Sequence, residues 1–233
     1  MTYTGFGVYQ QQPPPPPPRS NRRPLWTVLG VVVVLAVAGA VTGVVLAARG
    51  EEQAAPASTT STAPAPEWQV VEDEAAEIAY DLPPSWENSG GGVADRLRLT
   101  KTWVSRPFQC QGRNMIQAMV GSGGLANPDA RGVATGAVRA VARAGYAIDQ
   151  VEPDIADPVV SAETDDRLVL SVAVKPNAVS ACFSPAATVT AVALRKGPKV
   201  CVLVLNVAEG GPHVAEGPSD EDVKRILESV RLL

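Results

Sequence analysis

Cysteine, histidine and arginine are the residue types of this sequence whose spacing could support chemistry. The 233 residues include three cysteines and one histidine, His213, which lies in a Gly-Gly-Pro-His loop with no serine or cysteine motif nearby. His-dependent triads, HExxH zinc sites and CxxC pairs are absent from the sequence, and the GSGG run at 121–124 fits neither a nucleophile elbow nor a phosphate-binding loop. We interpret that run as a flexible turn, and we expect no enzyme, no metal site and no cofactor.

A stretch of five bases without an acid is the one charge anomaly of the sequence. These bases are Arg96, Arg98, Lys101, Arg106 and Arg113. They lie within residues 67–233, which carry 16 Lys and Arg against 22 Asp and Glu, a net charge of −6. Arginine suits phosphate and carboxylate groups, so an anionic cell-wall polymer or lipid headgroups are candidate ligands, and nucleic acid is not expected. The alternative is a strand face that is merely solvated.

An uncharged apolar segment precedes this region. Residues 25–48, LWTVLGVVVVLAVAGAVTGVVLAA, would form a helix roughly 36 Å long, against a hydrocarbon core of about 30 Å. This length predicts one transmembrane helix. A cleaved signal peptide is the alternative, but the apolar run is longer than a signal core and begins only after 24 residues of tail. Within it, Gly39 and Gly43 form a GxxxG motif that could pack two spans as a homodimer.

The charges beside this segment predict its orientation. Arg19, Arg22 and Arg23 precede it, whereas Arg49 is followed by acids and the next base is Arg96. Cytoplasmic flanks carry the excess of Lys and Arg in membrane proteins. The N-terminus is therefore predicted to lie in the cytoplasm and the C-terminal part outside the plasma membrane, which makes the chain a single-pass protein.

Composition divides the chain into further segments. Residues 1–24 contain six consecutive prolines and are predicted to be a disordered cytoplasmic tail. Residues 49–66 are rich in Ala, Pro, Ser and Thr, which cannot bury enough apolar surface to offset chain entropy, and we interpret them as a linker. Residues 67–233 are long enough for one extracytoplasmic globular domain.

Periodicity within this domain predicts many strands and two helices. Strands are expected at 68–72, 76–82, 96–104, 113–121, 167–175, 188–195 and 200–207, and a loose loop is expected at 90–92. One helix is expected to start within 127–129 and to run to about residue 145, and a second to run from 220 to about 231. The order of elements favours an α+β fold with a largely antiparallel sheet flanked by helices.

The same periodicity predicts which side chains share a face. In 96–104, a period of two places Leu97, Leu99 and Trp103 together and Arg96 and Arg98 side by side on the other face. Strand 167–175 is apolar on both faces, so both are expected to be covered. The first helix is expected to begin with an N-cap, a first-position proline and a first-turn acid in the sequence Asn127-Pro128-Asp129. Its expected buried face consists of Val133, Ala137, Val141 and Ala144.

Three cysteines outside the membrane leave one without a partner. If Gly197 and Pro198 form a two-residue hairpin loop, Cys201 lies opposite Leu194, and Cys182 lies beyond the open end of the hairpin, roughly 20 Å or more from Cys201. A Cys182 to Cys201 bond is therefore disfavoured, and the geometry leaves Cys110 to pair with either of the others.

Two short segments are similar to a known group of domains. The sequences YDLPPSW at 80–86 and ILESVR at 226–231 resemble small α/β sandwich domains of actinobacterial surface proteins and, more widely, the PsbP-like group. The resemblance covers most of 67–233. It implies an α/β sandwich with a disulfide between Cys110 and Cys182, which would leave Cys201 as a free core thiol, and it brings no catalytic residue.

These observations predict a membrane-anchored, extracytoplasmic binding or accessory domain at the plasma membrane. The alternative function is a sensor or signalling partner, which would couple the outer domain to cytoplasmic partners through the proline-rich tail.

Overall fold

The computed structural model describes residues 67–126, 129–147, 151–177 and 181–233. The predicted tail, transmembrane helix and linker at 1–66 lie outside the described residues, and so do Gly39 and Gly43. Within the part that the structure describes, no helix is long and apolar enough to cross a membrane.

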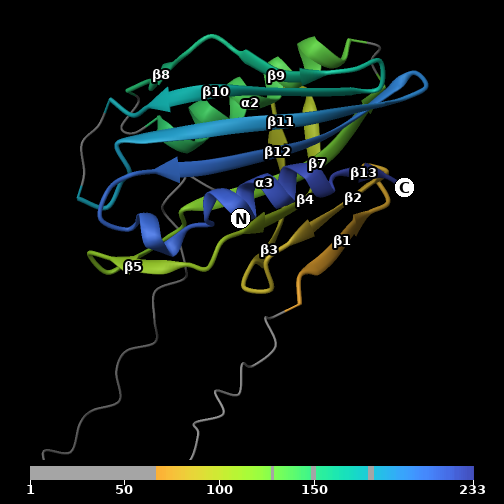
Figure 1. Ribbon diagram of the computed structural model, residues 1–233. Helices are drawn as coiled ribbons and strands as arrows, with labels where there is room; N and C mark the ends of the chain where they lie inside the picture. Colours follow the sequence, from red (N-terminus) through yellow and green to blue (C-terminus); the bar gives the residue numbers. More distant parts are fainter. Residues whose placement is uncertain (1–66, 127–128, 148–150, 178–180) are drawn as a thin grey trace, which may run out of the picture. The chain divides into compact units, whose positions relative to one another are not determined.

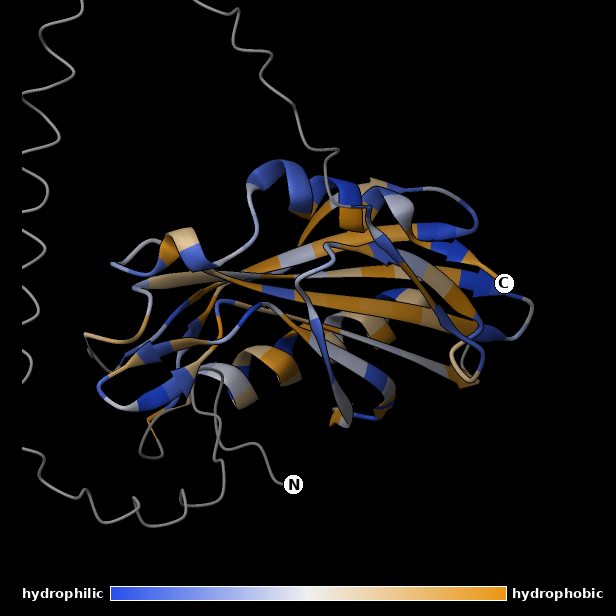
Figure 2. Ribbon diagram, turned by 90° about the horizontal axis from the view of Figure 1, so that it is seen from below, coloured by the Kyte–Doolittle hydropathy of each residue, from blue (hydrophilic) through white to orange (hydrophobic). Residues whose placement is uncertain are grey.

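An antiparallel sheet of eight strands forms the centre of the domain (Figure 1). Its order is β3 (Glu87–Ala94), β4 (Leu97–Val104), β7 (Ala118–Ala126), β12 (Lys199–Glu209), β11 (Ala186–Lys196), β10 (Arg167–Lys175) and β8 (Asp154–Ile155), and β9 (Val159–Glu163) pairs with β10 on the same side as β8. The longest strands lie in the middle, and Figure 2 shows their apolar residues in orange.

Each face of this sheet has its own hydrophobic core. Helix α2 (Ala130–Tyr146) covers one face, where residues such as Leu168 and Leu170 are buried. The opposite face is covered by a three-stranded sheet and by helix α3 (Asp220–Ser229), with Ile226 fully buried. The small sheet consists of β1 (Gln69–Asp73), β2 (Ile78–Leu82) and β13 (Arg231–Leu232). The predicted α+β class with a largely antiparallel sheet is confirmed.

Helix α2 begins and ends slightly differently from the prediction. Asp129 is the N-cap and not a first-turn acid, because its side chain accepts a 2.8 Å hydrogen bond from the backbone N–H of Gly132. Gly145 does not end the helix but is buried within it. Ala144 is exposed, contrary to expectation, since the buried face continues through Ala142 and Tyr146 as the period of 3.6 requires.

The last helix and the predicted hairpin agree closely with expectation. Ser219 and Asp222 form a capping box at the start of α3. The helix ends at Ser229 because the next residues pair with β2 as β13. In the β11–β12 hairpin, Leu194 lies opposite Cys201, which is the predicted register.

Strand β4 contains a β-bulge that changes which residues share a face. Its pairing with β7 shifts between Leu99 and Lys101. Leu97 and Leu99 lie in the core beneath α2, whereas Trp103 packs against the core of the opposite face. The prediction that Trp103 shares a face with the two leucines is therefore wrong, because a bulge adds one residue and reverses the alternation after it.

The glycine run at 121–124 lies inside β7 and is not a flexible turn. A Cβ atom on Gly123 would lie 2.3 Å from the carbonyl oxygen of Arg98, and one on Gly121 would lie 2.8 Å from Cδ1 of Leu99. Strand β4 thus approaches the backbone of β7 at a distance that only glycine permits.

Two further expectations are corrected. Residues 90–92 belong to strand β3, which pairs with β4 through two register shifts, and do not form a loose loop. One face of β10 is only partly covered, because Val169 is half-buried against α3 while Ala173 is exposed. Helix α3 is too short to reach the full length of this strand.

Candidate functional site

The four arginines predicted to bind an anion are all exposed. Arg96 lies in the turn between β3 and β4, Arg98 lies in β4, Arg106 follows β4, and Arg113 begins the short strand β6 (Arg113–Met115). The fifth base, Lys101, is engaged differently, since its ammonium group donates a hydrogen bond to the carbonyl of Glu72 in β1.

Strand β4 divides these arginines into two pairs. It contains eight residues, which at about 3.3 Å per residue put about 25 Å between Arg96 and Arg106. The structure therefore keeps Arg96 and Arg98 within one hairpin but does not bring them to Arg106 and Arg113.

Most other bases of the domain have partners. Arg131, Arg139 and Arg143 of α2 pair with acids of 151–163, at 2.5, 3.3 and 3.8 Å. The guanidinium carbon of Arg225 lies 4.0 Å from the ring centre of Trp68, which is a cation–π contact. By contrast, none of the four predicted arginines has an ion pair or side-chain hydrogen bond among the described residues, so their charges are available to a ligand.

A disulfide joins Cys110 to Cys182, as the resemblance implied. It attaches the hairpin of β5 (Phe108–Cys110) and β6 to the segment before β11, and Phe108 stacks on His213 with 4.5 Å between ring centres. The single histidine is thus a packing partner of this hairpin.

Cys201 is a free thiol near the start of β12, as the third of its eleven residues, with no exposed surface. Burial raises its pKa, which disfavours the reactive thiolate. Nearby, Glu77 accepts hydrogen bonds from Lys196 at 2.8 Å and Lys199 at 2.7 Å, and these two lysines lower its pKa to about 2.

A buried polar cluster around Asp73 was not predicted from the sequence. One carboxylate oxygen of Asp73 accepts hydrogen bonds from the hydroxyls of Ser122 at 2.6 Å and Thr100 at 2.5 Å, and the other accepts from the N–H of Ala76 at 3.1 Å. The hydroxyl of Tyr80 lies 3.2 Å from that of Ser122.

This cluster has a structural role. Asp73 is 1% exposed and Ser122 is fully buried, so no substrate can reach them. Burial raises the pKa of Tyr80, which therefore keeps its proton at neutral pH. Together the three hydrogen bonds to Asp73 attach the end of β1 to β4, β7 and the β1–β2 turn. The signal in the sequence is weak, because an acid at the end of a strand usually lies in solvent.

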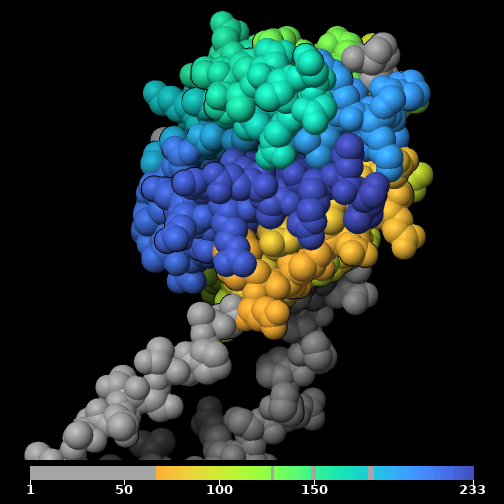
Figure 3. Space-filling view, turned by 45° about the vertical axis from the view of Figure 1, so that its right-hand side comes forward, coloured from red at the N-terminus to blue at the C-terminus, as the bar shows by residue number. Residues whose placement is uncertain are grey.

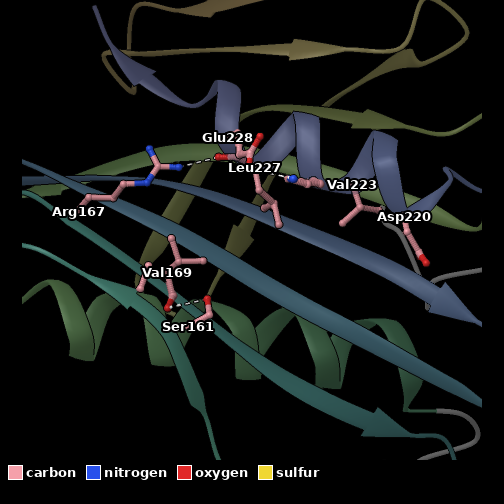
Figure 4. Close-up of a pocket in the computed structure, with 9 residues that line it drawn as sticks. Ser161, Arg167, Val169, Asp220, Val223, Leu227 and Glu228 are labelled. Carbon is pink, nitrogen blue, oxygen red and sulfur yellow. Dashed lines mark hydrogen bonds and ion pairs between the residues drawn. The ribbon is translucent and has the colours of Figure 1, made fainter.

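A groove of about 470 Å³ lies between β9 and α3 and was also not predicted. Val169 of β10 lies at its base, Val223 and Leu227 of α3 form one wall, and Ser161 and Ala162 of β9 form the other (Figure 4). Asp220 and Glu228 lie along its rim, together with Lys224, whose ammonium group lies 3.9 Å from the carboxylate of Glu228. Among the described residues, no group of three or more His, Cys, Asp or Glu side chains is placed to hold a metal ion.

Proteins of known structure that are similar to the domain include a cyanobacterial PsbP and a yeast Ran-binding protein. The cyanobacterial PsbP of Synechocystis sp. PCC 6803 is 10% identical, with a TM-score of 0.46, over 77% of this chain and 100% of that one. The Ran-binding protein Mog1p of Saccharomyces cerevisiae is also 10% identical, with a TM-score of 0.43, over 71% of this chain and 95% of that one. No curated protein matches the sequence. A family model matches residues 61–233, and the chain therefore belongs to the family described as Domain of unknown function (DUF8017).

Proposed function

We propose that this protein is a membrane-anchored, extracytoplasmic binding or accessory domain whose ligand is an anionic cell-wall polymer or lipid headgroup. The observation that carries the proposal is the state of Arg96, Arg98, Arg106 and Arg113. All four are exposed, and none has a partner among the described residues of a domain in which most other bases do. An acidic domain repels anions in general, so unpaired arginines must supply the local attraction.

The disulfide supports the location outside the cytoplasm. Bonds such as that between Cys110 and Cys182 persist in oxidising compartments and are rare where thiols are kept reduced. The uncharged segment 25–48 and the arginines before it supply an anchor with the N-terminus inside. Protease added to intact cells or spheroplasts should then remove the domain and leave the tail. Protection of the domain from that protease would contradict this orientation.

Arg96 and Arg98 are the pair to test first, because one hairpin holds them within reach of the same phosphate or carboxylate group. Replacing both by Ser should abolish salt-sensitive co-sedimentation of the full chain with anionic liposomes or with isolated cell wall. Binding to only one of the two materials identifies the source of the anion. Thermal stability should stay nearly unchanged, since exposed charges contribute little to folding.

The matched control replaces two arginines of α2 that already have acidic partners. Arg131→Ser with Arg139→Ser removes the same charge from the domain but takes it from existing ion pairs. Retention of this control should equal that of the unaltered protein. If both double variants lose retention equally, net charge is responsible and the β3–β4 hairpin is not a site.

We also propose that the anchor supports a homodimer through Gly39 and Gly43. Small residues at a GxxxG spacing let two helices approach closely in lipid. Gly43→Ile should reduce cross-linking between spans in a membrane. An unchanged yield would remove this part of the proposal.

A further inference from the structure

Strand β9 is an exposed edge of the large sheet. It pairs with β10 on one side, and no described strand lies on its other side. Four of its five residues are exposed. The edge at β3 differs, because three glycines and two register shifts interrupt it. Bulges and irregular pairing protect an edge from further pairing, and β9, with a single register shift, is the more regular of the two.

Two of the three apolar side chains of β9 lie on the same face of the sheet as α3. Ala162 lines the groove and Val159 lies beyond it along the strand, whereas Val160 packs against the core beneath α2. Ala162 lies opposite Val169, and Val159 lies opposite Ser171, so alternation places Val159 and Ala162 on the face that α3 covers. Val159 is 65% exposed, although it is a large apolar residue. In Figure 3 the side chains of β9, in blue-green, lie beside those of α3, in dark blue.

Both walls of the groove are held in place. The guanidinium of Arg167 donates to the carbonyls of Leu227 at 2.7 Å and Val230 at 2.9 Å, which attaches the end of α3 to β10 (Figure 4). On the other wall, Arg131 of α2 donates to Glu163 at the end of β9. A pre-formed site loses less entropy when a ligand binds than one that must be ordered.

The charge around the groove favours a basic occupant. Residues 151–166 contain six acids and no Lys or Arg, although three of these acids pair with arginines of α2. The two bases that line the groove are themselves engaged, Arg167 with carbonyls of α3 and Lys224 with Glu228. By contrast, Asp220, Glu221 and Asp222 at the start of α3 have no basic partner among the described residues. Pairing of β9 with the same strand of a second copy would bring two acidic segments together, which Coulomb repulsion disfavours.

From the free edge, the apolar groove and the acidic surroundings, we infer that β9 and α3 bind an extended segment of a partner protein. The segment adds a strand to β9, places apolar side chains against Val159, Val169 and Leu227, and presents Lys or Arg to the acidic rim. Peptides bind other domains in this way, with main-chain hydrogen bonds for affinity and a pocket for specificity. This site lies at the opposite edge of the sheet from Arg96 and Arg98, so either proposal can fail while the other stands.

The experiment selects random peptides of about ten residues, displayed on phage, against the full chain in mild detergent. Val159→Lys introduces a charge that opposes a basic peptide and removes the apolar contact. Val93→Lys is the matched control, because Val93 is a 73% exposed valine on the other edge strand, β3. We expect enriched peptides that alternate apolar with basic residues, an affinity about ten-fold or more weaker for Val159→Lys, and unchanged affinity for Val93→Lys.

Hydrogen exchange distinguishes strand addition from other binding. The amides of β9 should become protected when a selected peptide binds, and N-methylation of alternate residues of that peptide should abolish the effect. Equal binding by the two lysine variants, or no enrichment on the unaltered protein, would overturn the inference. A concentration-dependent dimer that Val159→Lys abolishes would also overturn it, since the edge would then belong to a second copy.

Discussion

Loss of the disulfide between Cys110 and Cys182 should lower the stability of the domain by about 4 kcal/mol. The bond closes a loop with a sequence separation of 72. In the chain-entropy model, the cost of closing such a loop is removed from the unfolded state, and a loop of this length corresponds to about 4 kcal/mol at 25 °C. For a domain of this size, the expected fall in Tm is about 10 °C.

The assay compares thermal unfolding with and without reductant in three proteins. The unaltered protein should show the full gap between its oxidised and reduced forms. Cys201→Ala should be less stable, because it changes a fully buried side chain, but should show the same gap, since Cys201 forms no disulfide. Cys110→Ser with Cys182→Ser should show no gap.

A gap in the double serine variant, or none in the unaltered protein, would refute this reasoning. Peptide mapping without reductant gives an independent check, because a fragment that links Cys201 to either of the others would contradict the pairing. Reduction should also loosen the β5–β6 hairpin locally, which faster hydrogen exchange near Phe108 would show.

Three further substitutions test other parts of the structure by chemical denaturation. Asp73→Ala should cost about 3 kcal/mol, because the buried hydroxyl of Ser122 and the half-buried hydroxyl of Thr100 lose their acceptor. A cost near zero would show that the cluster does not stabilise the fold. Gly123→Ala should cost about 2 kcal/mol or more, since its Cβ would lie 2.3 Å from a carbonyl oxygen. The control Gly92→Ala should change stability little, because its Cβ would lie 3.8 Å from the nearest atom. Equal effects of the two substitutions would contradict the close approach of β4 to β7. Glu77→Gln should destabilise at neutral pH. The pKa of Glu77 is lowered on folding from 4.5 to about 2, so its contribution is present above about pH 4.5 and lost as the pH falls to about 2, and a difference between variant and unaltered protein that persists at pH 2 would refute this origin.

Local signals made parts of the fold predictable. The two-residue loop at Gly197 and Pro198 sets the register of the β11–β12 hairpin, so the position of Cys201 opposite Leu194 followed from counting residues. The capping box of Ser219 and Asp222 marked the start of α3 in the same way.

The incorrect predictions concern residues whose local structure depends on segments that are distant in the sequence. The bulge in β4 depends on its pairing with β7, and the need for glycine at 121 and 123 appears only beside Leu99 and Arg98. Alternation along a single strand cannot show such a shift.

The two candidate sites differ in the same way, because one could be predicted from the sequence and the other depends on the fold. The unpaired arginines were predicted because charge is visible in composition, although their separation into two pairs required the strand between them. The groove was missed because Ala162, Val169 and Leu227 come from three elements that are adjacent only in the fold.

The positions of the three cysteines along the chain bear on how the disulfide would form if the domain is exported, as we propose. If the domain crosses the membrane from its N-terminal end, residues 110 and 182 both reach the outside before residue 201. Oxidation can then join Cys110 to Cys182 while Cys201 is still on the other side, without a competing thiol. When Cys201 arrives, it enters a central strand in which each neighbouring position along the chain is also buried, and it is withdrawn from exchange. With export in this direction, the order of emergence would select the observed one of three pairings by timing, and a redox-active isomerase would be needed mainly by chains refolded from the fully reduced state.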